Sequence, residues 1–198
     1  MTKIKILVLT LLLLTISTLS FASEVKASDP VKIKMTTSKG DIILELYPDK
    51  APVTVENFLM YTEMNFYKKT IFHRVIAGFM IQGGGYTNAQ DKKRIPPKLK
   101  SIKNEADNGL KNDRGTIAMA RTRDPHSATA QFFINLKDND FLNHTNKTMN
   151  GWGYTVFGKV TKGMDVVDQI ARVKTIATAG QQNIPVSPIY IEDVEVMK

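Results

Sequence analysis

The 198-residue sequence contains no cysteine, so its fold cannot depend on disulfides, and thiolate metal ligands and cysteine nucleophiles are excluded. It has only three histidines, and these show neither the short spacing nor the carboxylate neighbours of a metal site. Neither a Gly-x-Ser-x-Gly turn nor a phosphate-binding loop motif is present. Hydrolase, nucleotide and metal chemistry therefore lack support, and we expect no metal and no cofactor.

Long apolar runs are lacking after the first residues. Residues 1–22 combine two lysines, an apolar stretch at 6–14 and a small-x-small sequence at 20–22, the three parts of a secretory signal peptide. A membrane anchor is the alternative, but the stretch is short for the roughly 20 residues of a span, and no cysteine is available for a lipid. We expect cleavage, no stable membrane insertion, and export to the periplasm, with secretion as the alternative.

The sequence also has no excess of acidic residues: it contains 27 basic and 19 acidic residues, which gives a net charge of +8. The basic residues are scattered apart from the short run at 92–94, and export argues against a nucleic-acid partner. We interpret the charge as a solvated basic surface. With 42% hydrophobic and 23% charged residues, the composition is that of an ordinary globular domain.

One folded domain is predicted at residues 31–198, after a flexible polar tail at 23–30. Apolar residues recur with strand-like patterns in eight short stretches, separated by Gly, Asn, Asp and Pro clusters. The predicted strands are residues 31–36, 42–47, 71–76, 79–82, 116–120, 132–136, 154–160 and 189–196, of which the first two form a hairpin. Helical spacing predicts helices at 53–64 and 164–173. This combination favours an antiparallel barrel or sandwich.

Three polar or glycine-rich stretches could carry chemistry. The stretch at 87–114 is longer than a connecting loop in a compact domain usually is, which indicates a functional surface loop. The glycines at 83–85 indicate a close backbone turn, because no helix-forming stretch follows them as phosphate binding would require. His126 lies between Asp124 and Ser127, but turn chemistry around Pro125 explains this group better than a catalytic triad.

Arg74 stands out because it interrupts an otherwise apolar strand pair, residues 72–84 (FHRVIAGFMIQGG). An unpaired buried charge costs several kcal/mol, so its guanidinium must be hydrogen-bonded or lie at the mouth of a cleft. From this segment alone, two interpretations remain open: a functional arginine, or an arginine paired with a carboxylate such as Glu45 or Glu105.

Residues 72–84 resemble the signature strand pair of the cyclophilins. Similar blocks follow in the family's order at residues 119–121 (MAR), 127–134 (SATAQFFI), 141–142 (FL) and 156–160 (VFGKV), and together the resemblance extends over residues 31–196. It implies a mainly β fold, a closed eight-stranded antiparallel barrel capped by two helices, with the active site on the outer face. It also implies peptidyl-prolyl cis/trans isomerase activity.

Carried over position by position, the resemblance implies that Arg74 is the catalytic residue. It implies that ten further residues bind the substrate: Phe79, Met80, Gln82, Ala120, Arg121, Gln131, Phe133, Phe141, Leu142 and Tyr154. Phe141 and Tyr154 stand where the family often has Trp and His. Because Phe141 lacks the indole N–H donor, we expect weak binding of cyclosporin-type ligands with catalysis largely kept.

These residues suit rotation about an X–Pro bond, whose barrier is roughly 18–20 kcal/mol because resonance holds the amide planar. A fixed guanidinium stabilises the twisted amide nitrogen more than either planar isomer, so no nucleophile is needed. The expected partners are proline-containing peptides and unfolded exported proteins, and the expected state is a monomer. A proline-binding chaperone without turnover and a small-ligand barrel carrier remain alternatives.

Overall fold

The computed structural model describes residues 29–88, 93–94, 97–178 and 180–197. The predicted signal peptide at 1–22 and most of the predicted tail at 23–30 lie outside the described residues. Within the described ranges, no helix has the length and apolar character needed to cross a membrane.

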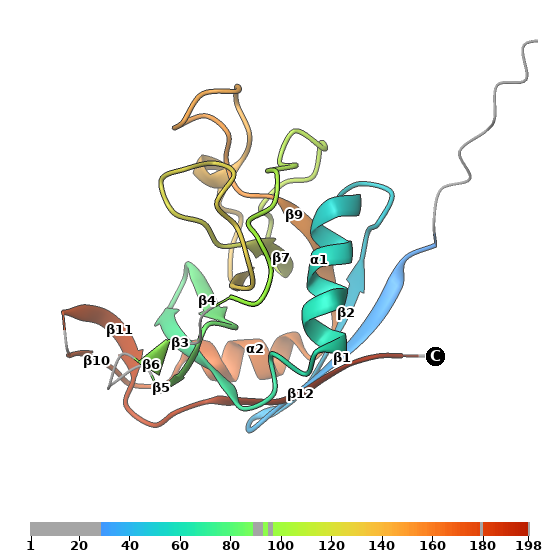
Figure 1. The fold of residues 1–198 in the computed structure, drawn as a ribbon. Helices are drawn as coiled ribbons and strands as arrows, with labels where there is room; N and C mark the ends of the chain where they lie inside the picture. The colour runs from blue at the N-terminus through green and yellow to red at the C-terminus, as the bar shows by residue number, and fades with distance from the viewer. Residues whose placement is uncertain (1–28, 89–92, 95–96, 179, 198) are drawn as a thin grey trace, which may run out of the picture.

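Eight antiparallel strands close into a barrel (Figure 1). In order around the barrel they are β1 (Val31–Thr37), β12 (Tyr190–Val196), β3 (Thr70–Ile76), β4 (Met80–Gly83), β8 (Phe132–Asn135), β7 (Thr116–Met119), β9 (Val156–Lys162) and β2 (Gly40–Leu46). Each predicted strand corresponds to one of these, with ends that differ by one or two residues. The predicted hairpin is confirmed, because β1 and β2 pair in register from Val31 opposite Leu46 to Thr37 opposite Gly40.

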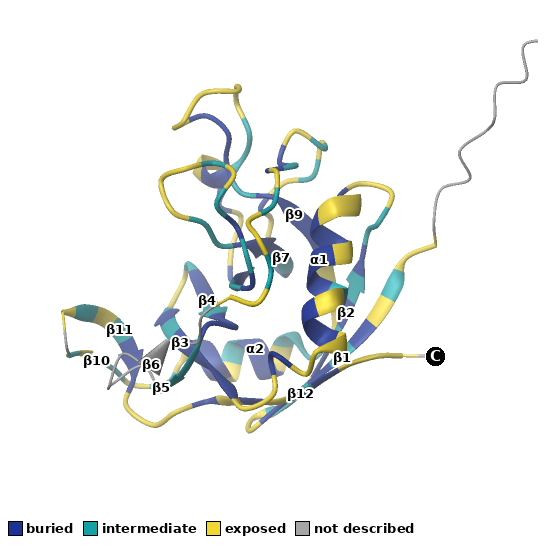
Figure 2. Ribbon diagram, viewed as in Figure 1, coloured by how far each residue is buried: buried dark blue, intermediate teal, exposed yellow. Residues whose placement is uncertain are grey.

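Two helices pack against the barrel, as predicted. Helix α1 (Pro52–Glu63) begins one residue before the predicted start, with Pro52 in the first turn, where its missing N–H costs nothing. Helix α2 (Met164–Ala171) ends two residues before the predicted end. Each turns a buried face to the barrel and an exposed face to solvent (Figure 2), and Phe58 of α1 and Ile170 of α2 are fully buried in the core.

Aromatic side chains fill the interior of the barrel. The ring of Phe132 lies 5.9 Å from that of Phe58, 5.7 Å from that of Tyr67 and 6.1 Å from that of Phe72. All four side chains are at most 1% exposed. Since the barrel is occupied by its own side chains, the carrier interpretation gains no support from the described residues.

Five short elements were not predicted. They are β5 (Tyr86–Asn88), β6 (Lys93–Arg94), β10 (Thr175–Thr178), β11 (Gln181–Pro185) and the 3-10 helix η1 (Asp140–Leu142). The β10–β11 hairpin packs beside β3, where Ile184 joins Ile71 and Tyr86 in a small apolar cluster. The long connections that precede β7, β8 and β9 gather on one side of the barrel, at the top of Figure 1.

Candidate active site

A bulge in β3 determines which way Arg74 points. Phe72 pairs with Gly83 and Arg74 pairs with Gln82, so His73 is an extra residue in the ladder. In a regular strand Phe72 and Arg74 would share one face. Because of the bulge, Phe72 is fully buried in the barrel while Arg74 is half-buried on the outer face.

Strand register extends this outer row across the sheet. Gln82 on β4 lies opposite Arg74 on one side and Phe133 of β8 on the other, and Phe133 lies opposite Ala118 of β7. The matching inward row consists of Val75, Ile81, Ile134 and Ile117, all buried in the core. Neighbouring strands thus supply polar and apolar groups to one outer surface.

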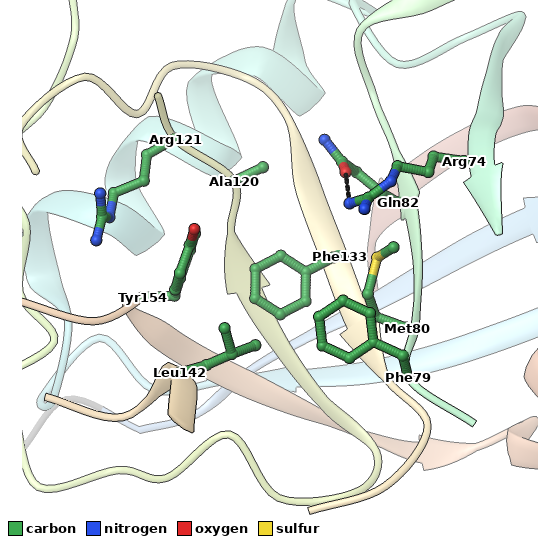
Figure 3. A pocket seen from close by; sticks show the side chains of 9 residues that line it. All are labelled: Arg74, Phe79, Met80, Gln82, Ala120, Arg121, Phe133, Leu142 and Tyr154. Atoms are coloured by element: carbon green, nitrogen blue, oxygen red, sulfur yellow. Dashed lines mark hydrogen bonds between the residues drawn. The ribbon is translucent and has the colours of Figure 1, made fainter. Parts of the chain in front are cut away.

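On this surface, nine of the eleven predicted site residues line one pocket of about 120 Å³ (Figure 3). They are Arg74, Phe79, Met80, Gln82, Ala120, Arg121, Phe133, Leu142 and Tyr154. Arg74 and Arg121 lie on opposite sides, with the apolar side chains between them (Figure 3). Sites for drug-sized ligands have volumes of about 300–1,000 Å³, so this much smaller pocket suits one small ring.

The other two predicted residues, Gln131 and Phe141, lie at the rim. Gln82 Nε2 donates to Gln131 Oε1 at 3.1 Å, and Arg74 Nη1 makes a long contact of 3.5 Å with Gln82 Oε1. The chain bends at Gly84 and Gly85, and Gly84 has φ 79°, in agreement with the close backbone turn predicted at 83–85. Phe141 is 72% exposed and stacks on Phe79 with ring centroids 5.6 Å apart.

Neither Glu45 nor Glu105, the two carboxylates considered as partners of Arg74, forms an ion pair with it. Glu105 caps α1, accepting hydrogen bonds from the backbone N–H groups of Val53 and Thr54 at 3.1 and 2.9 Å. Among the described residues, no ion pair includes Arg74. The interpretation of Arg74 as the partner of Glu45 or Glu105 is therefore wrong. Its guanidinium lies at the pocket, next to the Gln82 side chain.

Arg121 and Tyr154 form the wall opposite Arg74. The Arg121 guanidinium lies 4.5 Å from the Tyr154 ring centroid, and its Nε donates to the Gly153 carbonyl at 2.9 Å. Gly153 has φ 71°, and a Cβ there would lie 2.6 Å from the backbone of Leu142 and Asn143. Glycine at 153 therefore allows the Tyr154 segment to approach the segment that carries Leu142.

Three buried asparagines, Asn112, Asn135 and Asn139, lie behind the pocket and are at most 1% exposed. Asn135 Nδ2 donates to Asn112 Oδ1 at 3.2 Å, and Asn139 Nδ2 donates to Asn135 Oδ1 at 2.8 Å. The network also binds the backbone carbonyls of three pocket residues: Phe79, Leu142 and Tyr154. These pocket residues lie outside the barrel strands, and the asparagine amides add to the backbone hydrogen bonds that the Phe79 and Leu142 carbonyls accept from Leu136 and Tyr154. Asn112 belongs to the predicted functional loop at 87–114.

The group around His126 is a local turn, as predicted. Asp124 Oδ1 accepts a hydrogen bond from the His126 backbone N–H at 2.9 Å, and Ser127 Oγ donates to the Asp124 carbonyl at 2.7 Å. His126 Nδ1 accepts from the Asn104 N–H at 3.1 Å. No nucleophile is therefore activated by these side chains.

Sequence reasoning missed two polar hollows that adjoin the pocket. One, of about 440 Å³, includes His73, Tyr86 and the tip of the β10–β11 hairpin at 181–183. The other, of about 180 Å³, includes Thr122, Ser127 and Thr129. These residues come from segments far apart in the sequence, so no local periodicity reveals them. The only signal in the sequence was the three consecutive amides at 181–183.

Comparison with known proteins agrees with this geometry. Residues 32–196 match the family model described as cyclophilin type peptidyl-prolyl cis-trans isomerase. Peptidyl-prolyl cis-trans isomerase cyp18 of Streptomyces antibioticus is 60% identical over 166 residues, which cover 83% of this chain and 98% of that protein. Peptidyl-prolyl cis-trans isomerase B of Escherichia coli is 56% identical over 160 residues, 81% of this chain and 96% of that protein.

Solved structures agree as well. A cyclophilin type peptidyl-prolyl cis-trans isomerase from Cryptosporidium parvum superposes with a TM-score of 0.71 at 27% identity, covering 85% of this chain and 98% of that one. A second structure of that protein, in the presence of the dipeptide Ala-Pro, gives 0.70 at 28% identity, covering 84% and 99%. The barrel, the outer-face pocket and these matches lead to one conclusion: the chain belongs to the cyclophilin-type peptidyl-prolyl cis-trans isomerases.

Proposed function

We propose that this isomerase accelerates X–Pro bond rotation in exported polypeptides and so assists their folding, with Arg74 as the catalytic residue. The observation that best supports the catalytic assignment is the position of Arg74, which has no carboxylate partner within the described residues and borders an apolar pocket of about 120 Å³. A proline ring held in that pocket brings its own amide nitrogen to the pocket rim, where the guanidinium lies.

The proposed mechanism stabilises the twisted amide. When the X–Pro bond rotates, the nitrogen lone pair leaves conjugation with the carbonyl and becomes a hydrogen-bond acceptor. Arg74 donates to it, and this bond is stronger in the twisted state than in either planar isomer. Phe79, Met80 and Phe133 hold the ring while the preceding carbonyl swings. No covalent bond forms or breaks.

Gln82 positions the catalytic arginine in this mechanism. Its amide oxygen faces Arg74 Nη1, and its amide nitrogen is held by Gln131 Oε1 at 3.1 Å. This bond orients the oxygen, rather than the NH₂ group, toward the guanidinium. The preorganised donor then needs little reorganisation when the amide twists.

Export of the protein rests on the N-terminal sequence. Residues 1–22 have the charged, apolar and small-residue parts of a cleavable signal. Expressed with this segment in a bacterium that has an outer membrane, the protein should be recovered in the periplasmic fraction with a mature N-terminus near residue 23, as determined by N-terminal sequencing. Full-length protein in the cytoplasmic fraction would refute export.

Weak cyclosporin binding is a further part of the proposal, because Phe141 offers a ring at the rim but no N–H donor. Phe141→Trp should tighten cyclosporin binding about tenfold, since one net hydrogen bond contributes about 1–1.5 kcal/mol. Phe141 is 72% exposed, so the larger ring has room. Titration calorimetry measures the effect, with Phe141→Leu as the control that lacks both ring and donor. Equal affinity of the wild type and Phe141→Trp would contradict this explanation.

A further inference from the structure

A larger hollow of about 750 Å³ continues from the proline pocket. We call it the arginine groove and define it by Arg121, Arg123, Phe141, Leu142, Met149 and Tyr154. It shares Arg121, Leu142 and Tyr154 with the pocket. A polypeptide held by its proline advances about 3.3–3.6 Å per extended residue, so residues within two or three positions of the proline reach the groove.

The groove is cationic. Its lining includes two arginines and no carboxylate, and the adjoining pocket adds Arg74 and again no carboxylate. Arg121 Nε and Nη1 donate to the backbone carbonyls of Gly153, Thr122 and Arg123, and the guanidinium lies over the Tyr154 ring. No carboxylate of the described residues pairs with it. Within the described part of the chain, Arg121 Nη2 makes no hydrogen bond and Arg123 makes no ion pair.

The acidic residues nearest in sequence do not neutralise this surface. Asp124 and Asp140 are absent from the groove lining. The Asp124 carboxylate accepts a hydrogen bond from the His126 backbone, and Asp140 Oδ1 accepts one from Asn143 Nδ2 at 3.3 Å. Among the described residues, Arg121 Nη2 and the Arg123 guanidinium therefore remain available to a carboxylate from outside.

The same groove carries large exposed apolar side chains. Phe141 is 72% exposed and Met149 is 63% exposed, the two highest values among the large apolar residues that the structure describes. Exposed apolar surface beside a binding pocket is typical of contact with a partner chain. The lining thus combines charge-assisted donors with apolar surface.

We propose that the arginine groove selects polypeptides with an acidic residue two or three positions from the isomerised proline, bound by Arg121 and Arg123. An apolar neighbour of that acidic residue rests on Phe141 and Met149. This inference rests on the proposed function, because the same substrate chain occupies the pocket. Carboxylate to guanidinium bonds are charge-assisted, and a cationic surface also speeds the encounter with an acidic chain.

The test compares peptides that differ in one side chain. One series places Asp, Asn or Lys two or three residues before a single proline, and a second series places them after it. Isomerisation is measured by NMR exchange, which needs no protease. At low ionic strength, kcat/KM for the best Asp peptide should be about 3 to 10 times that of its Asn counterpart, with the Lys peptide lowest. The advantage should shrink at about 0.5 M salt, because exposed charges are screened.

Two charge reversals locate the effect. Arg123→Glu should abolish or invert the preference for Asp over Asn. Arg172→Glu, at the exposed C-cap of α2, changes the net charge equally outside the groove and should leave the preference intact. Equal kcat/KM for Asp and Asn peptides, or the same response to both reversals, would overturn the inference. If the Asn peptides are isomerised normally in that case, the proposed function stands; if no peptide is isomerised, the proposed function itself fails.

Discussion

Arg74→Ala should lower kcat/KM for a proline-containing peptide by about 10² to 10³, the loss found when one preorganised donor to a developing charge is removed. Arg74→Lys should recover only part of this loss, because an ammonium keeps the charge without the planar fork. Arg74 is half-buried on the outer face, so the barrel core is not disturbed. NMR exchange on a model peptide and proline-limited refolding both measure the effect.

A matched arginine outside the pocket controls for the general loss of a cation. Arg114 pairs with Asp168 at 2.9 Å and does not line the pocket. Arg114→Ala should therefore keep the wild-type kcat/KM, with unfolding followed by circular dichroism for both variants. An unchanged rate in Arg74→Ala would refute the catalytic assignment. If that variant loses turnover but still binds peptides and suppresses aggregation, the chaperone alternative gains support.

The barrel was predictable because its strands are short, alternating and bounded by turn residues. The period of two is clearest in β1 and β2, where every second residue from the third onward is buried in the interior. The β10–β11 hairpin was missed because its strands, TIAT and QQNIP, mix polar and apolar residues without a regular alternation, and only Ile184 and Pro185 are buried. Nothing in such a stretch distinguishes a strand from a loop until its contact with β3 is known.

The pocket was predictable only through family motifs, because local patterns are ambiguous where it is built. The bulge at His73 breaks the alternation, so the period alone would place Arg74 on the same face as Phe72. Asn112 and Asn139 lie in loops where asparagine is common for turn formation, and their burial depends on contacts between distant segments. The roles of the predicted site residues stay predictions until variants are measured.

Phe132→Ala should affect mainly stability and Phe133→Ala mainly activity, although the two residues are adjacent on β8. Phe132 is fully buried between aromatic rings inside the barrel, so its truncation should lower the free energy of unfolding by about 3–5 kcal/mol. Phe133 points into the pocket, where its ring lies 5.6 Å from that of Tyr154. Its truncation enlarges a surface pocket and leaves no closed cavity in the core, so we expect a smaller loss of about 1–3 kcal/mol.

Activity should show the reverse order. Phe133→Ala should lower kcat/KM by about 10- to 100-fold, mainly through KM, because the lost ring contacts stabilise planar and twisted substrate alike. Phe132→Ala, measured well below its lowered unfolding temperature, should stay within about threefold of the wild type per folded molecule. Urea unfolding and peptide kinetics separate the two effects. If Phe132→Ala lost more activity than Phe133→Ala at equal folded fraction, the outer face of β8 would not be the substrate face, and the pocket assignment would fail with it.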